Sequence, residues 1–218
     1  MTKIKVCGNT RAQDVELALA LGVELLGFIF TRSPRRIGID EARVLTAGIP
    51  DGVERVGVFI DEPTAEIAQA VESCGLTAVQ IYRPISEEDR RLGVLLLPAL
   101  RMRHGESLRE DGFRPADHPL LDTFRPDTDG GGTGQTWDWS VAEALARRYP
   151  IVVSGGLSPA NVGAAIGRLR PWGVDVCSGV EAEPGKKDPV KLRSFVEAVR
   201  AASVPRPTLA ADAVGEGE

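Results

Sequence analysis

The sequence predicts an α/β protein that folds as a single (β/α)8 TIM barrel with an irregular or short fifth helix. Eight short β-type runs can be counted along its 218 residues, and most of them are followed by a helical pattern. Strands that alternate with helices imply right-handed crossovers and a parallel sheet, and eight such units suggest that the sheet closes. An open doubly wound sheet is the rival architecture, because it uses the same alternation.

The expected elements follow one another in regular order. Strands are expected at 3–7, 26–30, 55–60, 77–82, 93–100, 118–123, 150–154 and 173–177. The helical patterns are clearest at 11–21, 40–48, 63–74, 139–148, 158–169 and 188–201. Ser158 and Asp188 each precede a proline, so each is expected to cap a helix whose first turn holds that proline. Glycines and a proline interrupt residues 101–117, which predicts the irregular fifth helix.

The barrel is expected to form a catalytic domain over residues 1–201. With 43% hydrophobic residues, the chain can bury a core of domain size. Residues 202–218 offer few large apolar groups to bury, so we expect them to form a disordered C-terminal tail.

Composition narrows the classes of function. The formal net charge of -5 argues against general nucleic-acid binding, which asks for a basic face. No apolar stretch reaches the roughly 18 to 20 residues that span a bilayer, and the polar start lacks a signal-peptide pattern, so we expect a soluble cytoplasmic protein with no membrane partner. The chain has three widely spaced cysteines and two histidines, which are too few and too scattered to supply the ligands of a zinc site, so we expect no metal.

Several reactive side chains fall at or near predicted strand ends. In a barrel of this kind, catalytic groups come from the carboxyl ends of the strands and the loops after them. The side chains in such places are Cys7, Arg35, Gln80, Asp122, Ser154 and Ser178. We therefore expect them to share one rim.

Cys7 and Asp122 end two of the strands, and a thiol that faces a carboxylate could move protons in opposite directions on one substrate. Lys5 lies two residues before Cys7, and Asp175 lies two before Cys177, so the members of each pair share a face. If both pairs face the barrel interior, Lys5 could neutralise Asp175 and favour the Cys7 thiolate. The structural alternatives are a small buried cysteine and an aspartate that caps a turn or pairs with an arginine.

Glycine turns follow the last two predicted strands, at Ser154-Gly155-Gly156 and at Ser178-Gly179. Glycines let the backbone approach an oxyanion closely, and barrels often bind phosphate after strands seven and eight. The pair of turns therefore predicts a phosphate cradle, and two ordinary tight turns are the alternative.

The glycine-rich segment 129–136 invites a nucleotide-loop interpretation, but Gln135 stands where that motif needs lysine. A mobile loop that closes over bound substrate suits so much glycine better, with plain flexible linkage as the alternative.

Two further pairs of residues are candidates for ligand contact. Arg35 and Arg36 follow the second strand, where a guanidinium could form a two-pronged contact with a carboxylate. Gln80 and Tyr82 share a face of the fourth strand, where they either touch a ligand or pack the barrel.

Taken together, these segments resemble the phosphoribosylanthranilate isomerase family of tryptophan biosynthesis over nearly all of residues 3–200. The matching text is Lys5-Val6-Cys7-Gly8, Gly27-Phe28-Ile29-Phe30, Ser33-Pro34-Arg35, Arg55-Val56-Gly57-Val58-Phe59, Leu120-Leu121-Asp122-Thr123, the run from Gly131 to Trp139, Ser154-Gly155-Gly156-Leu157, and the run from Val174 to Asp188. The motifs of the first, sixth and eighth strands are specific in combination.

The resemblance implies an anionic small-molecule substrate, N-(5-phosphoribosyl)anthranilate, and an Amadori rearrangement that needs neither metal nor organic cofactor. It implies that Asp122 is the general acid that protonates the ribose ring oxygen and that Cys7, as a thiolate, is the general base at C2. Arg35 matches the family arginine that holds the anthranilate carboxylate, and Arg36 is the adjacent candidate. The remaining substrate-binding candidates are Gln80, Asp175, Gly155, Gly156, Ser178 and Gly179.

The chain departs from the family pattern in three places, one of which is a longer or differently built loop from Asp122 to Gly131 that contains Arg125 and Asp127. Where the family usually reads Val-Gln-Leu-His-Gly, this chain has Tyr82 and Arg83 for the last two residues, and Asn9 replaces an apolar residue close to Cys7. A divergent paralogue is therefore an alternative, acting on a related phosphoribosyl-arylamine or retaining only ligand binding. Other rivals are a Schiff-base lyase or aldolase that uses Lys5 and the related sugar isomerase of histidine biosynthesis, which generally has an aspartate in place of Cys7. The sequence is compatible with a monomer or a homodimer.

Overall fold

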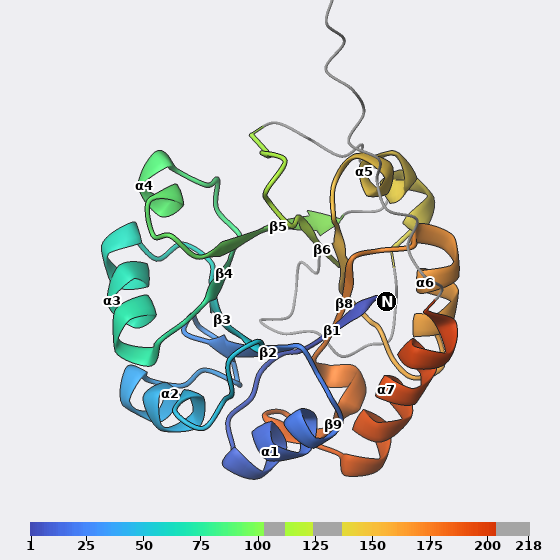
Figure 1. The fold of residues 1–218 in the computed structure, drawn as a ribbon, viewed down its shortest axis with the longest axis horizontal. Coiled ribbons are helices and arrows are strands. Elements are labelled where there is room, and N and C mark those ends of the chain that lie inside the picture. The colour runs from blue at the N-terminus through green and yellow to red at the C-terminus, as the bar shows by residue number, and fades with distance from the viewer. Residues whose placement is uncertain (103–111, 124–136, 204–218) are drawn as a thin grey trace, which may run out of the picture.

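The computed structural model describes residues 1–102, 112–123 and 137–203. Within these ranges, eight parallel strands close into a barrel in chain order, and β8 pairs with β1. Figure 1 looks down this barrel and shows the helices arranged around the strands. The closed sheet confirms the predicted (β/α)8 barrel and excludes the open doubly wound sheet.

All eight barrel strands overlap the runs that the sequence predicts. Their bounds are β1 (Lys3–Val6), β2 (Leu25–Ile29), β3 (Glu54–Phe59), β4 (Ala78–Ile81), β5 (Leu95–Met102), β6 (Leu120–Thr123), β7 (Val152–Val153) and β8 (Gly173–Val176). A small antiparallel pair follows β8, made of β9 (Glu181–Glu183) and β10 (Lys186–Lys187).

The helices are α1 (Ala12–Ala20), α2 (Ile39–Thr46), α3 (Thr64–Cys74), α4 (Glu87–Arg90), α5 (Glu143–Arg148), α6 (Val162–Leu169) and α7 (Pro189–Ala202), with 3-10 turns η1 (Trp139–Ala142) and η2 (Ser178–Val180). The short α4 is not among the expected helical patterns, and the Ser86 hydroxyl caps it by accepting from the Asp89 N–H at 3.1 Å. Between β5 and β6, the described residues 112–119 contain no helix. The glycine-rich segment 129–136 and residues 204–218 of the expected tail lie outside the described residues.

The two predicted proline caps have different outcomes. Asp188 caps α7 as predicted, because its carboxylate accepts from the backbone N–H of Val190 at 2.9 Å and of Lys191 at 3.1 Å. The prediction for Ser158 is wrong, since α6 begins at Val162. The Ser158 carbonyl instead accepts from the Asn161 and Val162 N–H groups, which forms a separate turn before the helix.

The strands alternate between a face that packs on the helices and a face that fills the barrel. Leu26 joins the large core shared with the helices, whereas its neighbour Leu25 belongs to a second cluster inside the barrel. That interior layer consists of Leu25, Val56, Ala78, Leu97, Ala99, Leu120 and Val152. Two residues further along the same strand faces come Val58, Gln80, Asp122 and Ser154. The barrel interior therefore changes from apolar to largely polar toward the carboxyl ends of the strands.

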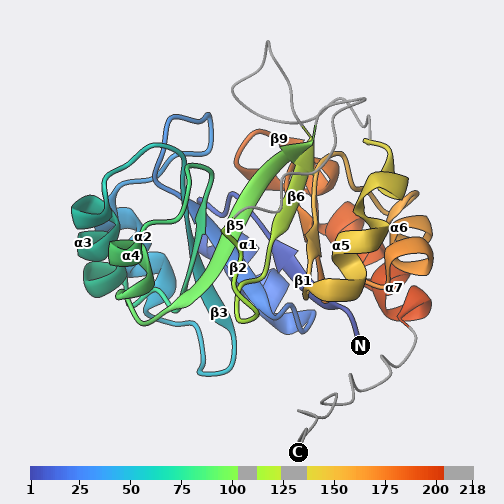
Figure 2. The same cartoon turned by 90° about the horizontal axis from the view of Figure 1, so that it is seen from above.

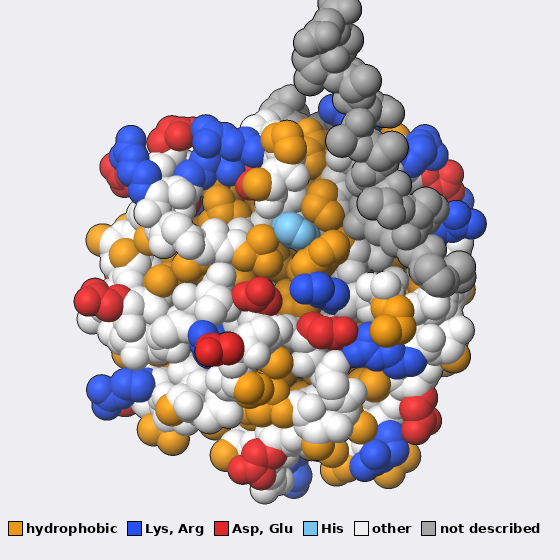
Figure 3. All heavy atoms as spheres, in the orientation of Figure 1, with side chains coloured by type: hydrophobic (Ala, Val, Ile, Leu, Met, Phe, Trp, Pro, Cys, Tyr) orange, Lys and Arg blue, Asp and Glu red, His pale blue; other side chains and the backbone are white. Residues whose placement is uncertain are grey.

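The two ends of the barrel differ in chemistry. Figure 2 places β9 at the end opposite the amino terminus, so the polar layer opens on the β9 side. Figure 3 views the amino-terminal end, where a histidine lies among hydrophobic side chains. Within the described ranges the only histidine is His118, and its ring lies 4.1 Å from that of Trp172.

None of the helices in the described part of the chain combines the length and apolar character that crossing a bilayer requires.

Candidate active site

A buried ion pair lies at the base of the polar layer. Lys5 and Asp175 are register partners on β1 and β8, and Lys5 Nζ lies 2.9 Å from Asp175 Oδ1. The hydroxyl of Ser154 donates to the other carboxylate oxygen at 2.9 Å. Burial alone would lower the pKa of Lys5, but the charges of Asp175 and Cys7 hold it above its usual value. The predicted neutralisation of Asp175 by Lys5 is confirmed.

Cys7 directly follows β1 and is buried beside Ile29 and Val58. Its backbone N–H donates to the Val176 carbonyl at 2.9 Å, which continues the β1–β8 pairing by one residue. A hydrogen bond with the Cys177 side chain and the positive charge of Lys5 lower the pKa of the Cys7 thiol to about 7, although burial opposes this. The thiolate is therefore accessible near neutral pH.

Asp122 is held through both of its carboxyl oxygens. The Tyr82 hydroxyl donates to Oδ2 at 2.7 Å, and the backbone N–H of Thr123 donates to Oδ1 at 2.8 Å. Burial raises the pKa of Asp122 above its ordinary value, and these hydrogen bonds only partly oppose the rise. Tyr82 also packs against the cluster that contains Cys7, so the thiol and the carboxyl group lie in the same mouth of the barrel.

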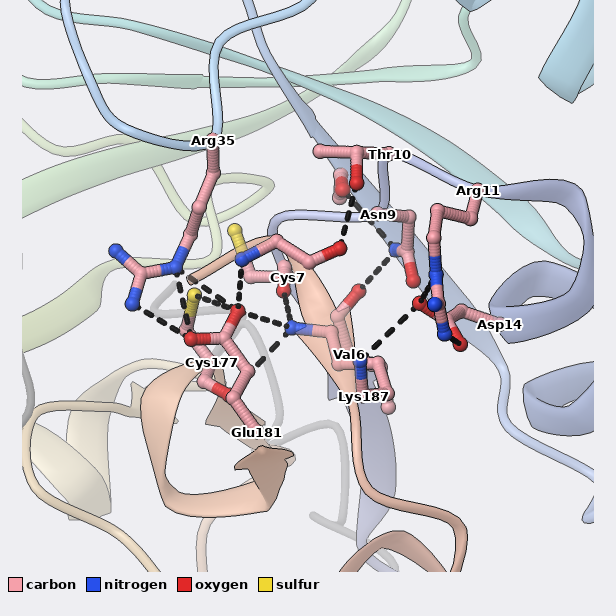
Figure 4. Close-up of polar contacts among 12 residues, drawn as sticks. Val6, Cys7, Asn9, Thr10, Arg11, Asp14, Arg35, Cys177, Glu181 and Lys187 are labelled. Carbon is pink, nitrogen blue, oxygen red and sulfur yellow. Dashed lines mark hydrogen bonds and ion pairs between the residues drawn. The ribbon is translucent and has the colours of Figure 1, made fainter. Parts of the chain in front are cut away.

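The side chain of Arg35 is held in place by an ion pair with Glu181. Its Nε and Nη2 both donate to the Glu181 carboxylate, at 2.9 Å and 2.6 Å, so the two-pronged contact expected of this arginine is made within the protein. Figure 4 shows Glu181 between Arg35 and Lys187. Burial would raise the pKa of Glu181, but Arg35 and Lys187 hold it below its usual range. Arg36 turns its Nε to the Phe30 carbonyl at 3.0 Å.

Lys187 ties this ion cluster to the backbone beside the thiol. Its Nζ lies 3.0 Å from Glu181 Oε1 and donates to the Cys7 carbonyl at 2.5 Å, and the side chain is fully enclosed. Figure 4 shows these contacts joining Lys187 of β10 to Cys7, which follows β1, and to Glu181 of β9. Glu181 and Lys187 are not among the predicted site residues, although both lie in the run from Val174 to Asp188 that carries the family resemblance.

The two glycine turns are packed so closely that a side chain at Gly155 or Gly179 would not fit. Gly155 and Gly156 adopt φ values of +82° and +71°, where other residues are strained. A Cβ on Gly179 would collide with the Leu157 carbonyl oxygen, so the turn after β8 packs directly on the turn after β7. Among the described residues, the N–H groups of Gly155 and Gly156 donate to no hydrogen bond, which leaves them available to an anion.

The described residues that depart from the family pattern have defined partners. Arg83 turns toward α4, where its guanidinium binds Asp89 at 2.6 Å. The buried Asn9 amide donates to the Val6 and Gly27 carbonyls at 2.8 Å and 3.1 Å. In the described ranges, no group of three or more His, Cys, Asp or Glu side chains is placed to hold a metal ion.

Comparison with known proteins identifies the family of this barrel. The model of the family described as N-(5'phosphoribosyl)anthranilate (PRA) isomerase matches residues 4–198. The chain belongs to this family. A PRA isomerase from Rubrobacter xylanophilus is 43% identical, with 92% of this chain and 100% of that protein covered. One from Chlorobaculum tepidum is 41% identical, with 93% and 96% covered.

Solved PRA isomerase structures share the fold. The enzyme from Thermotoga maritima superposes with a TM-score of 0.81 at 35% identity, covering 92% of this chain and 100% of that one. Another PRA isomerase, in complex with reduced 1-(o-carboxyphenylamino)-1-deoxyribulose 5-phosphate, has a TM-score of 0.77 at 34% identity, with the same coverage.

Proposed function

We propose that this protein catalyses the Amadori rearrangement of N-(5'-phosphoribosyl)anthranilate to 1-(2-carboxyphenylamino)-1-deoxyribulose 5-phosphate in tryptophan biosynthesis. Family membership and the relative in complex with a reduced form of that product support the substrate. The observation that carries the proposal is the pairing of Cys7 and Asp122. The pKa of the thiol is lowered and the pKa of the carboxyl group is raised, in one mouth of one barrel.

The first step opens the sugar ring. Asp122, whose raised pKa favours its protonated form, gives its proton to the ribose ring oxygen as the bond from that oxygen to C1 breaks. The nitrogen lone pair forms the C1–N double bond of a Schiff base. A carboxylate remains on Asp122, where Tyr82 and the Thr123 N–H face it.

The second step moves a proton from carbon. The Cys7 thiolate removes the proton from C2, the electron pair of that C–H bond forms the C1–C2 double bond, and the π pair of the C1–N double bond returns to nitrogen, which gives an enolamine. Tautomerisation of the enolamine then yields the C2 ketone. Each proton in the two enzyme-assisted steps is handled by a side chain of the protein.

The two ends of the substrate would be held by different groups. The phosphate would bind to the backbone at the Gly155-Gly156 and Ser178-Gly179 turns, where a Cβ on Gly155 would collide with Thr123 and a Cβ on Gly179 would collide with the Leu157 carbonyl oxygen. Because Glu181 occupies Nε and Nη2 of Arg35, Nη1 is the proposed donor to the anthranilate carboxylate. Asp175 would support the interior beneath the phosphate, and Gln80 would line the mouth.

Location and assembly complete the proposal. A cytoplasmic location fits an isomerase of free metabolites. A relative from Thermotoga maritima is described as dimeric, which makes a homodimer one proposed state beside the monomer.

Purified protein and freshly prepared N-(5'-phosphoribosyl)anthranilate test the proposal. We expect the anthranilate-type fluorescence to decay faster than in buffer alone and mass analysis to show an isomer of unchanged mass. Binding without decay would support the ligand-binding paralogue instead. Turnover of the aminoaldose of the histidine pathway, with none of the anthranilate substrate, would assign the barrel to the other sugar isomerase. A lysine adduct trapped by borohydride would favour the Schiff-base enzymes that use Lys5.

A further inference from the structure

A chain of two hydrogen bonds leads from β4 to the carboxyl group of Asp122. Gln80 Nε2 donates to the Tyr82 hydroxyl oxygen at 3.0 Å, and that hydroxyl donates to Asp122 Oδ2 at 2.7 Å. An amide NH2 group can only donate, so the phenolic proton is left to point at Asp122. The direction of the second bond is therefore set by the first.

The ring of Tyr82 is itself fixed. One side packs against the cluster of Cys7, Ile29 and Val58, and the Arg101 guanidinium lies 4.9 Å from the ring centroid. Arg101 is the register partner of Asp122 on the neighbouring strand β5. Tyr82 thus bridges the proposed base and the proposed acid, and its hydroxyl has little freedom to leave Asp122.

The phenol is suited to remain a donor throughout the reaction. Burial and the neighbouring Asp122 charge raise the pKa of Tyr82 well above its ordinary value, so the phenol keeps its proton at neutral pH. A hydrogen bond to a charged acceptor is stronger than one to a neutral acceptor. The contact is therefore stronger after Asp122 has given up its proton than before.

We propose that Tyr82 is a positioning residue for Asp122, which turns its carboxyl group toward the sugar ring oxygen and stabilises the carboxylate left by ring opening. This inference rests on the proposed function. It assigns a role in the reaction to a tyrosine that stands where the family usually has histidine.

The test is Tyr82→Phe, which removes one hydroxyl and keeps the ring. The matched control is Tyr149→Phe, the same change in the only other tyrosine of the chain, whose ring packs against Phe113 away from the barrel mouth. We expect Tyr82→Phe to lower kcat about tenfold to a hundredfold, as loss of a hydrogen bond to a charged group should, with little change in KM. Tyr82→His, which restores a side-chain N–H donor, should recover part of the loss.

The pH profile separates positioning from packing. Without the Tyr82 hydrogen bond, which favours the carboxylate, the apparent pKa of Asp122 should rise, while that of Cys7, measured separately by thiol alkylation, should stay in place. A merely structural role would lower the melting temperature and leave both values unchanged. Unchanged kcat and pH profile in Tyr82→Phe, or a rise in KM alone, would overturn the inference.

A second readout does not depend on turnover. The 13C carboxyl resonance of Asp122, assigned by its absence in Asp122→Asn, can be titrated in the unmodified protein and in Tyr82→Phe. A higher pKa in Tyr82→Phe supports the contact even if the protein does not convert the proposed substrate, in which case only the proposed function fails. Equal pKa values in the two proteins would contradict the inference whether or not the enzyme is active.

Discussion

Lys5 Nζ and Asp175 Oδ1 lie 2.9 Å apart inside the barrel, where the side chains are 1% and 5% exposed. Charged side chains that are this deeply buried almost always have a partner of opposite charge. Here each side chain finds its partner on the neighbouring strand. The pair also acts on Cys7: after the hydrogen bond from Cys177, which lowers the pKa of the thiol most, the Lys5 charge lowers this pKa and the Asp175 charge raises it.

Lys5→Met should destabilise the fold strongly, because it leaves the Asp175 carboxylate buried without its counter-charge. We expect the free energy of unfolding to fall by about 3 to 5 kcal/mol in urea titrations. Arg168→Met, which breaks the exposed Arg168–Glu143 pair, is the control and should cost no more than about 1 kcal/mol. Equal small losses in both variants would contradict the role of the buried pair.

The pH dependence of thiol alkylation should report the thiolate of Cys7. Since the pKa of Cys7 is lowered to about 7, the rate of reaction with iodoacetamide should rise with pH and level off above that value, whereas the rise for an ordinary cysteine is centred near about 8.5. Cys177→Ala removes the side chain that hydrogen-bonds to Cys7 and should move the midpoint upward. The pKa of Cys74 is raised by burial, so Cys74→Ala should leave the midpoint in place. A midpoint near the ordinary value in the unmodified protein would refute this description of the site.

Glu181→Gln should weaken substrate binding more than it slows chemistry. It removes the negative charge that Nε and Nη2 of Arg35 contact, so the guanidinium loses its fixed orientation toward the substrate carboxylate. We expect KM to rise about tenfold in steady-state kinetics, with a smaller change in kcat. The control is Glu183→Gln on the same strand β9, where the glutamate is exposed and pairs with Lys186. A loss confined to kcat would argue against Arg35 as the carboxylate anchor.

Gly179→Ala should impair phosphate binding, because the added methyl group would collide with the Leu157 carbonyl oxygen and push the two glycine turns apart. Inorganic phosphate, tested as a competitive inhibitor, should bind this variant less tightly. Gly167→Ala in α6 is the matched control, since a Cβ there meets nothing within 4 Å. If phosphate inhibits both variants as well as it inhibits the unmodified protein, the phosphate site lies elsewhere.

Much of the architecture can be predicted from the sequence, because the signals that determine it are local or repeat along the chain. The alternation along each strand predicts which residues enter the barrel, and the strand ends place Cys7, Asp122 and Ser154 at one rim. Helix starts are also local, yet the Ser158 cap fails, because α6 begins three residues after Pro159, at Val162, and the Asn161 side chain accepts from the Ser158 N–H at 2.8 Å.

The partners of the site residues are harder to predict from sequence. Arg35 and Glu181 are 146 residues apart in the chain, and Tyr82 and Asp122 are 40 apart. Neither pairing follows from composition or spacing, because each depends on which strands lie side by side and on how far each side chain reaches. The closed β1–β8 contact brings Lys187 to the backbone of Cys7, a contact that only the folded barrel reveals.

The most direct test of the central claim is kcat/KM of Cys7→Ala with N-(5'-phosphoribosyl)anthranilate, measured on protein whose melting temperature matches that of the unmodified chain. Removal of the general base should lower kcat/KM by about a hundredfold to ten-thousandfold, and Asp122→Asn should show a loss of similar size. A folded Cys7→Ala protein that turns over the substrate at nearly the normal rate would contradict the assignment of this thiol as the base.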